Sequence, residues 1–185
     1  MHLAVIVVDM VKDNFLENTR NPITPLAKAI VPAVNTLTRG GRERGWPVIF
    51  ACDSFLPDDF IFRGKMKPCA LRGTAGSEIT ELLETQGGDV YLPKRRFSAF
   101  FKTDLDQTLR TWRVDTVAVC GIATHFCVLS TAFDAVCLDF HTIIVDDASA
   151  SYSAQMHAQT LDLFRKNPLH PIFQVLSVEQ VLHLA

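Results

Sequence analysis

Residues 116–128 read TVAVCGIATHFCV, and this stretch predicts a buried strand that turns directly into a helix. The strand is the apolar run over 116–120, and a helix-like segment of small and apolar residues covers 126–138. Cys127 therefore lies at a strand-to-helix junction. The first N–H groups of a helix lack partners inside it and carry partial positive charge, which stabilises a thiolate and can hold an oxyanion. The junction is thus a candidate site for a cysteine nucleophile.

The same alternation of strand and helix continues on both sides of this junction. Apolar runs typical of buried strands cover residues 3–8, 47–52, 89–92, 116–120, 142–145 and 172–176. Helix-like segments cover residues 24–40, 77–85, 103–111, 126–138 and 154–166. Alternation of this kind predicts a Rossmann-like α/β fold with a doubly wound, mostly parallel sheet of six strands. The sheet would lie between two layers of helices, in a three-layer αβα arrangement. At 185 residues, we expect a single domain over 1–185.

Reactive side chains follow three of the predicted strands. Asp9 comes directly after the run 3–8, Lys94 follows the strand-like residues 89–93, and Cys127 follows 116–120. Ligands of open α/β sheets bind beyond the carboxyl ends of the strands. We therefore expect an acid, a cation and a thiol at the same edge of the sheet.

Short motifs at these positions resemble one known family. Asp9-Met10, the stretch KRRFSAFF at 94–101 and the stretch GIATHFCV at 121–128 are similar to motifs of the isochorismatase-like cysteine hydrolases. The stretches LRGTAG at 71–76, TAFDA at 131–135 and DDA at 146–148 resemble further motifs of that family, in the same order. The resemblance extends from about residue 3 to about residue 180. The family includes nicotinamidases, N-carbamoylsarcosine amidohydrolases, ureidoacrylate amidohydrolases and isochorismatases.

The resemblance implies a fold and a set of site residues. The fold is the isochorismatase-like hydrolase fold, and the catalytic triad maps onto Asp9, Lys94 and Cys127. A cis peptide bond is implied between Ile122 and Ala123, which aims the N–H of Ala123 at the same point as the N–H of Cys127. These two N–H groups would form the oxyanion hole, with Asp9 acting as general acid and base around a cysteine thioester.

The metal motif of the nicotinamidase-like members is incomplete in this chain. Phe55 stands where those members have the His of an Asp-x-His pair, and Cys69 stands where a later His belongs. Asp53 and Cys69 remain as candidate ligands, and together they make a poor zinc site. We therefore expect no metal and no other cofactor.

The substrate is expected to be a small molecule, and three activities are open. Hydrolysis of the C–N bond of a small amide or ureido compound ranks first, because a thiol is suited to acyl transfer. Vinyl-ether hydrolysis of the isochorismatase type ranks second, and a non-catalytic α/β binding protein ranks third. Aromatic candidates for the substrate pocket are Phe15, Phe97, Phe100 and Phe126. His125 and Arg96 are further residues close to the predicted site.

Composition argues against several other classes of protein. A formal net charge of −2 gives no support for nucleic-acid binding. No run of 18 apolar residues is present, which argues against a membrane span. Five cysteines without a signal-peptide pattern predict a reducing, cytoplasmic location. The family resemblance further implies a homodimer or a homotetramer.

Overall fold

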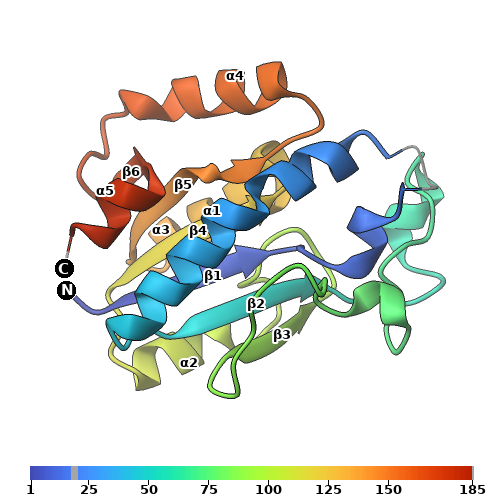
Figure 1. The fold of residues 1–185 in the computed structure, drawn as a ribbon, viewed down its shortest axis with the longest axis horizontal. Helices are drawn as coiled ribbons and strands as arrows, with labels where there is room; N and C mark the ends of the chain where they lie inside the picture. Colours follow the sequence, from blue (N-terminus) through green and yellow to red (C-terminus); the bar gives the residue numbers. More distant parts are fainter. Residues whose placement is uncertain (18–20, 185) are drawn as a thin grey trace.

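Six parallel strands form one twisted sheet at the centre of the protein (Figure 1). The computed structural model describes residues 1–17 and 21–184. The strands are β1 (Leu3–Val8), β2 (Val48–Asp53), β3 (Val90–Lys94), β4 (Thr116–Ile122), β5 (His141–Ala150) and β6 (Phe173–Leu176). Their order across the sheet is β3-β2-β1-β4-β5-β6. The direction of winding therefore reverses between β1 and β4, and the crevice at the carboxyl ends of such strands is the usual ligand position in this fold class.

The central strands are apolar on both faces because both faces are covered. Every residue of β1, β2 and β4 is buried. Alternate side chains of β1 point to opposite faces, so Val5 and Val7 join one hydrophobic cluster while Ile6 and Val8 join the other. Continuous apolar runs are the expected signature of strands buried in this way.

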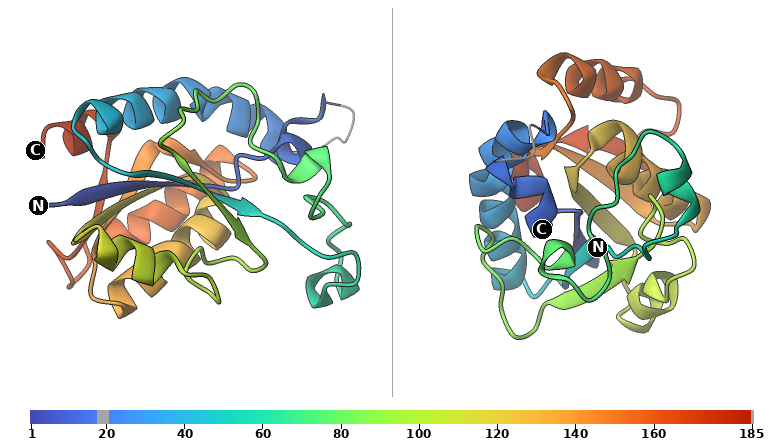
Figure 2. Two further views of the ribbon diagram at one scale, coloured as in Figure 1. Left: turned by 90° about the horizontal axis from the view of Figure 1, so that it is seen from below. Right: turned by 90° about the vertical axis from the view of Figure 1, so that its right-hand side faces the viewer.

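Helices cover both faces of the sheet and make up the outer layers (Figures 1 and 2). The helices α1 (Ile23–Glu43) and α5 (Val178–Leu182) contribute to one hydrophobic cluster. The helices α2 (Leu105–Thr111), α3 (Leu129–Cys137) and α4 (Ala154–Arg165) contribute to the other. The predicted three-layer, doubly wound α/β fold is confirmed, and the sheet is entirely parallel. Of the helices in the described part of the chain, none combines the length and apolarity needed to cross a membrane.

The helix expected over residues 77–85 does not form. The chain there holds only the end of the short 3₁₀ helix η4 (Ala75–Ser77), and the residues after it are largely irregular, with an antiparallel β-bridge between Ile79 and Val11. The backbone instead pairs with the segment after β1: Lys12 N donates to Glu78 O at 2.9 Å, and Thr80 N donates to Met10 O at 3.0 Å. These tertiary hydrogen bonds use backbone groups that a helix would need for itself.

Gly121 allows β4 to pass very close to β1. Its φ angle is +106°, and a Cβ atom at this position would lie 2.2 Å from the carbonyl oxygen of Val8. Only glycine tolerates both the backbone conformation and the approach. The contact places the segment after β1 directly beside the segment after β4, which are the segments that carry Asp9 and Cys127.

Candidate active site

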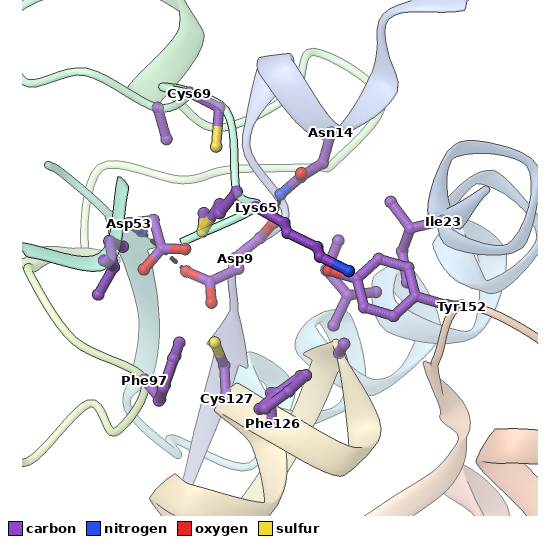
Figure 3. Close-up of a pocket in the computed structure, with 15 residues that line it drawn as sticks. Asp9, Asn14, Ile23, Asp53, Lys65, Cys69, Phe97, Phe126, Cys127 and Tyr152 are labelled. Atoms are coloured by element: carbon purple, nitrogen blue, oxygen red, sulfur yellow. Dashed lines mark hydrogen bonds between the residues drawn. The ribbon is translucent and has the colours of Figure 1, made fainter. Parts of the chain in front are cut away.

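Four strand ends bring reactive side chains to the crevice predicted by the topology (Figure 3). Asp9 follows β1, Asp53 ends β2 and Lys94 ends β3. Cys127 lies in η5 (Thr124–Val128), a single turn of π-helix between β4 and α3. The carboxylates of Asp9 and Asp53 and the thiol of Cys127 approach one another, and their ligand atoms all lie within 4.8 Å. The structure therefore brings the three predicted residues together and adds Asp53 to them.

Lys94 is the electrostatic centre of this group. Its side chain is fully buried, and its Nζ atom lies 2.8 Å from Asp9 Oδ2 and 2.6 Å from Asp53 Oδ1. The same ammonium donates a third hydrogen bond to the carbonyl oxygen of Arg96 at 3.1 Å. All three protons of the ammonium are thus used, which is how a buried lysine remains charged.

Asp9 is held by backbone groups as well as by Lys94. Its Oδ1 atom accepts a hydrogen bond from the N–H of Asp53 at 2.8 Å. Its own carbonyl oxygen accepts a hydrogen bond from Asn14 Nδ2 at 2.9 Å. With a φ of +55°, Asp9 adopts the left-handed conformation, which is uncommon for a residue other than glycine. The carboxylate is therefore fixed in one orientation beside the thiol.

Burial and nearby charges set the protonation states in this group. Burial raises the pKa of the Cys127 thiol well above its usual range, and the charge of Asp9 raises it further. Burial also raises the pKa of Asp53 to about 7, again assisted by Asp9. Burial by itself lowers the pKa of Lys94, but Asp53 and Asp9 outweigh it and raise that pKa well above its usual value. Burial and the charge of Asp9 both favour the protonated thiol of Cys127 over its thiolate.

The turn that carries Cys127 is anchored on both sides. The peptide bond between Ile122 and Ala123 is cis. The fully buried Thr124 has its Oγ1 atom 2.8 Å from His157 Nδ1 on α4. His157 Nε2 in turn lies 2.9 Å from Asp146 Oδ1. This hydrogen-bonded chain ties the turn to a helix on the outside of the sheet.

A pocket of about 550 Å³ opens over the thiol, a size suited to a small-molecule ligand. Its lining is mostly apolar, and the reactive groups lie on one side of it (Figure 3). The lining residues are Asp9, Asn14, Ile23, Asp53, Ile61, Lys65, Met66, Cys69, Ala70, Phe97, Ile122, Ala123, Phe126, Cys127 and Tyr152.

Two of the four predicted pocket aromatics lie elsewhere. Phe97 and Phe126 line the pocket, with their ring centroids 5.4 Å apart. Phe15 is buried in the cluster under α1, and Phe100 stacks on Phe140 in the opposite cluster. Neither belongs to the described lining of the pocket. The pattern of aromatic residues did not distinguish core from pocket, since both environments favour them.

Sequence reasoning missed the role of Asp53 as a partner of Lys94. The signal was present, because Asp53 ends an apolar run just as Asp9 does. Lys65 and Tyr152 also line the pocket, and they follow no pattern that singles them out. His125 does not line the pocket in the described structure, and its Nδ1 atom is hydrogen-bonded to Ser151.

The basic residues next to Lys94 turn away from the pocket. Arg95 and Arg96 both form ion pairs with the buried carboxylate of Asp59. They line a separate cavity together with Arg72 and Lys102. Arg96 contributes its carbonyl oxygen to the site, and its guanidinium points elsewhere.

The donor set does not fit a metal ion. Asp9, Asp53 and Cys127 are close enough to share a cation, but both carboxylates already bind the ammonium of Lys94. A second positive charge at this distance would be strongly repelled in a buried site. Phe55, which offers no donor atom, is buried and packs edge-on against Phe62.

Comparisons with known proteins find similar sequences and structures over nearly the whole chain. The family model described as Isochorismatase domain matches residues 3–180. A probable inactive nicotinamidase of Arabidopsis thaliana is 34% identical over an alignment of 172 residues, and the alignment covers 86% of this chain and 87% of that protein. The crystal structure of N-carbamoylsarcosine amidase from Thermoplasma acidophilum has a TM-score of 0.83 at 31% identity, covering 97% of this chain and 98% of that chain. Pyrazinamidase of Pyrococcus horikoshii in complex with zinc has a TM-score of 0.83 at 26% identity, covering 96% of this chain and 99% of that chain.

Proposed function

The chain belongs to the isochorismatase family of hydrolases, and from this premise we propose that it hydrolyses a C–N bond of a small amide or ureido substrate through a thioester on Cys127. The observation that carries the proposal is the contact of a buried thiol with a carboxylate that is itself held by a buried lysine. A nucleophile, an adjacent base and a group that orients the base are the parts that acyl transfer needs.

The first half of the reaction forms the thioester. Asp9 accepts the thiol proton as Cys127 Sγ attacks the carbonyl carbon of the substrate. The oxyanion that forms is held by the backbone N–H groups of Ala123 and Cys127, which both line the pocket. The C–N bond then breaks, and Asp9 returns its proton to the departing nitrogen.

The second half regenerates the enzyme. Asp9, again a carboxylate, takes a proton from water as the water oxygen attacks the thioester carbon. When the C–S bond breaks, the acid product leaves and the sulfur takes up the proton held by Asp9. Lys94 keeps Asp9 oriented throughout, through the contact between its Nζ atom and Asp9 Oδ2.

We further propose that this reaction proceeds without a metal. The ammonium of Lys94 supplies, between Asp9 and Asp53, the positive charge that a bound cation would bring. Activity is therefore expected to survive dialysis against EDTA. A loss of activity that zinc restores would contradict this part of the proposal.

Ammonia release is the test of the proposed reaction. The panel comprises nicotinamide, ureidoacrylate, N-carbamoylsarcosine and simple aliphatic amides, with isochorismate followed separately as pyruvate formation. We expect ammonia from at least one nitrogen compound and none from the same compound with Cys127→Ala. Thermal melting of the variant should match that of the parent protein, which separates loss of the nucleophile from loss of the fold.

Two outcomes would replace the proposal. Pyruvate formation that survives in Cys127→Ala would assign vinyl-ether hydrolysis in which the thiol takes no part. Absence of turnover across the panel, together with binding of a panel compound, would assign a non-catalytic binding protein.

A further inference from the structure

We propose that Lys65 forms an anion subsite in the catalytic pocket, so that the substrate carries a carboxylate at the end remote from the bond that is cleaved. This inference rests on the proposed function, because it identifies the ligand as the substrate. The subsite itself does not depend on the reaction. It assigns a class of compound: small amides or ureido compounds with a negatively charged tail.

The position of Lys65 supports this assignment. The residue lies in the loop between η3 (Phe60–Arg63) and β3 and belongs to the pocket lining. In Figure 3 its side chain extends across the pocket toward the side where Ile23 and Tyr152 lie, away from the carboxylate of Asp53. Within residues 1–17 and 21–184, no carboxylate forms an ion pair with Lys65. Its charge is therefore available to a ligand.

The charges on the reactive side of the pocket leave no net positive charge there. Lys94 balances Asp9, while Asp53 is a further carboxyl group whose pKa of about 7 leaves it partly ionised near neutral pH. An anionic substrate would meet no net attraction on this side. The ammonium of Lys65, on the opposite side, supplies the attraction and directs the charged tail away from the thiol.

Other cations do not compete for this role. Lys94 is fully buried behind the two carboxylates, and Arg95 and Arg96 are bound to Asp59 at a different cavity. Among the described pocket residues, Lys65 is thus the cation that faces the ligand space. Next to it, burial raises the pKa of Tyr152, so its phenol stays protonated and can donate a hydrogen bond to the same carboxylate.

Alkylation of Cys127 tests the subsite without any knowledge of the substrate. Iodoacetate and iodoacetamide are nearly the same size, but only iodoacetate is negatively charged. Their rates at Cys127 are measured by peptide mass spectrometry, which separates Cys127 from Cys69 in the same pocket. We expect Lys65→Met to lower the ratio of the iodoacetate rate to the iodoacetamide rate by about threefold to tenfold, and Lys65→Glu to lower it further.

Lys67→Met is the matched control for this experiment. Lys67 is an exposed lysine of the same loop that does not line the described pocket. Its substitution removes the same net charge from the protein and is expected to leave the ratio unchanged. If the ratio also stays constant in Lys65→Met and Lys65→Glu, or falls equally in Lys67→Met, the anion subsite is refuted.

A pair of substrates then connects the subsite to the reaction. Succinamate and 4-methylpentanamide share an amide and differ in that a carboxylate replaces an isopropyl group. Lys65→Met is expected to raise KM for succinamate about tenfold with little change in kcat, and to leave the neutral amide unaffected. A shifted alkylation ratio with no ammonia from any compound would retain the subsite and reject the proposed hydrolysis. Ammonia release with an unshifted alkylation ratio would retain the proposed hydrolysis and reject the subsite.

Discussion

Replacing Lys94 by methionine is expected to destabilise the fold strongly, because the lysine holds two buried carboxyl groups together. Its ammonium is fully buried and lies within 2.8 Å of both Asp9 and Asp53. Removing one member of a buried ion pair typically costs about 3–5 kcal/mol, since the remaining charge loses its partner. Methionine preserves most of the side-chain volume, so cavity formation adds little. We therefore expect the free energy of unfolding at pH 8 to fall by about 3–5 kcal/mol.

The loss should also depend on pH, in a direction that the pKa of Asp53 sets. The pKa of Asp53 in the folded protein is about 7, above its ordinary value of 3.8, so its contribution to stability is greatest below 3.8 and is lost as the pH rises through 7. Without Lys94 this pKa rises further, and the variant retains its proton to a higher pH. Between pH 7 and pH 8 this extra bound proton increases the loss of unfolding free energy in Lys94→Met by about 1 kcal/mol.

Urea unfolding followed by far-UV circular dichroism at pH 6 and pH 8 measures both effects. The double variant Lys94→Met/Asp53→Asn is the control, since it removes the ionisable carboxyl group as well. It is expected to recover part of the stability and to lose the additional pH dependence. A single variant as stable as the parent protein at pH 8, or a loss identical at both pH values, would refute the account of Lys94 as the partner of two buried carboxyl groups.

Three further substitutions test other parts of the site. Asp9→Asn should abolish ammonia release. It should also shift the pH midpoint of Cys127 alkylation by iodoacetamide downward, because the charge that raises the thiol pKa is gone. An unchanged or higher midpoint would contradict this. His157→Ala should lower the free energy of unfolding by about 1–3 kcal/mol, because the buried hydroxyl of Thr124 loses its partner. The same variant should lower kcat more than it changes KM. Urea unfolding and steady-state kinetics measure these effects, and an unaltered kcat would show that His157 does not support the turn. Gly121→Ala should prevent accumulation of folded protein, since its Cβ would lie 2.2 Å from the carbonyl oxygen of Val8; a soluble variant with unchanged thermal melting would refute the close approach of β1 and β4.

Much of the architecture was accessible from the sequence for a local physical reason. Strands buried on both faces must be apolar throughout, so the runs 3–8 and 116–120 were recognisable without any knowledge of their neighbours. A polar residue at the end of such a run marks the carboxyl end of a strand, and this predicted Asp9 and Cys127 at one edge of the sheet. The same rule applies to Asp53. It was instead interpreted as a candidate metal ligand, because its contact with Lys94, 41 residues further along the chain, is not visible in the sequence.

Other parts depended on contacts between distant segments. The stretch 77–85 has a helical pattern, but hydrogen bonds to Met10 and Lys12 hold it in an irregular conformation. Phe97 reaches the pocket while Phe100, three residues later, enters the core, and only the backbone path between β3 and α2 determines which way each ring points.

By itself, then, the sequence determined the α/β class, the strand ends and the positions of Asp9, Lys94 and Cys127 beside them, because burial on both faces and strand termination are encoded locally. The tertiary structure alone decided that Lys94 pairs with two carboxyl groups, that burial raises the pKa of Cys127 and that Lys65 faces the ligand space. Charge interactions and desolvation depend on distances between groups that are far apart in the chain, and those distances exist only in the folded protein.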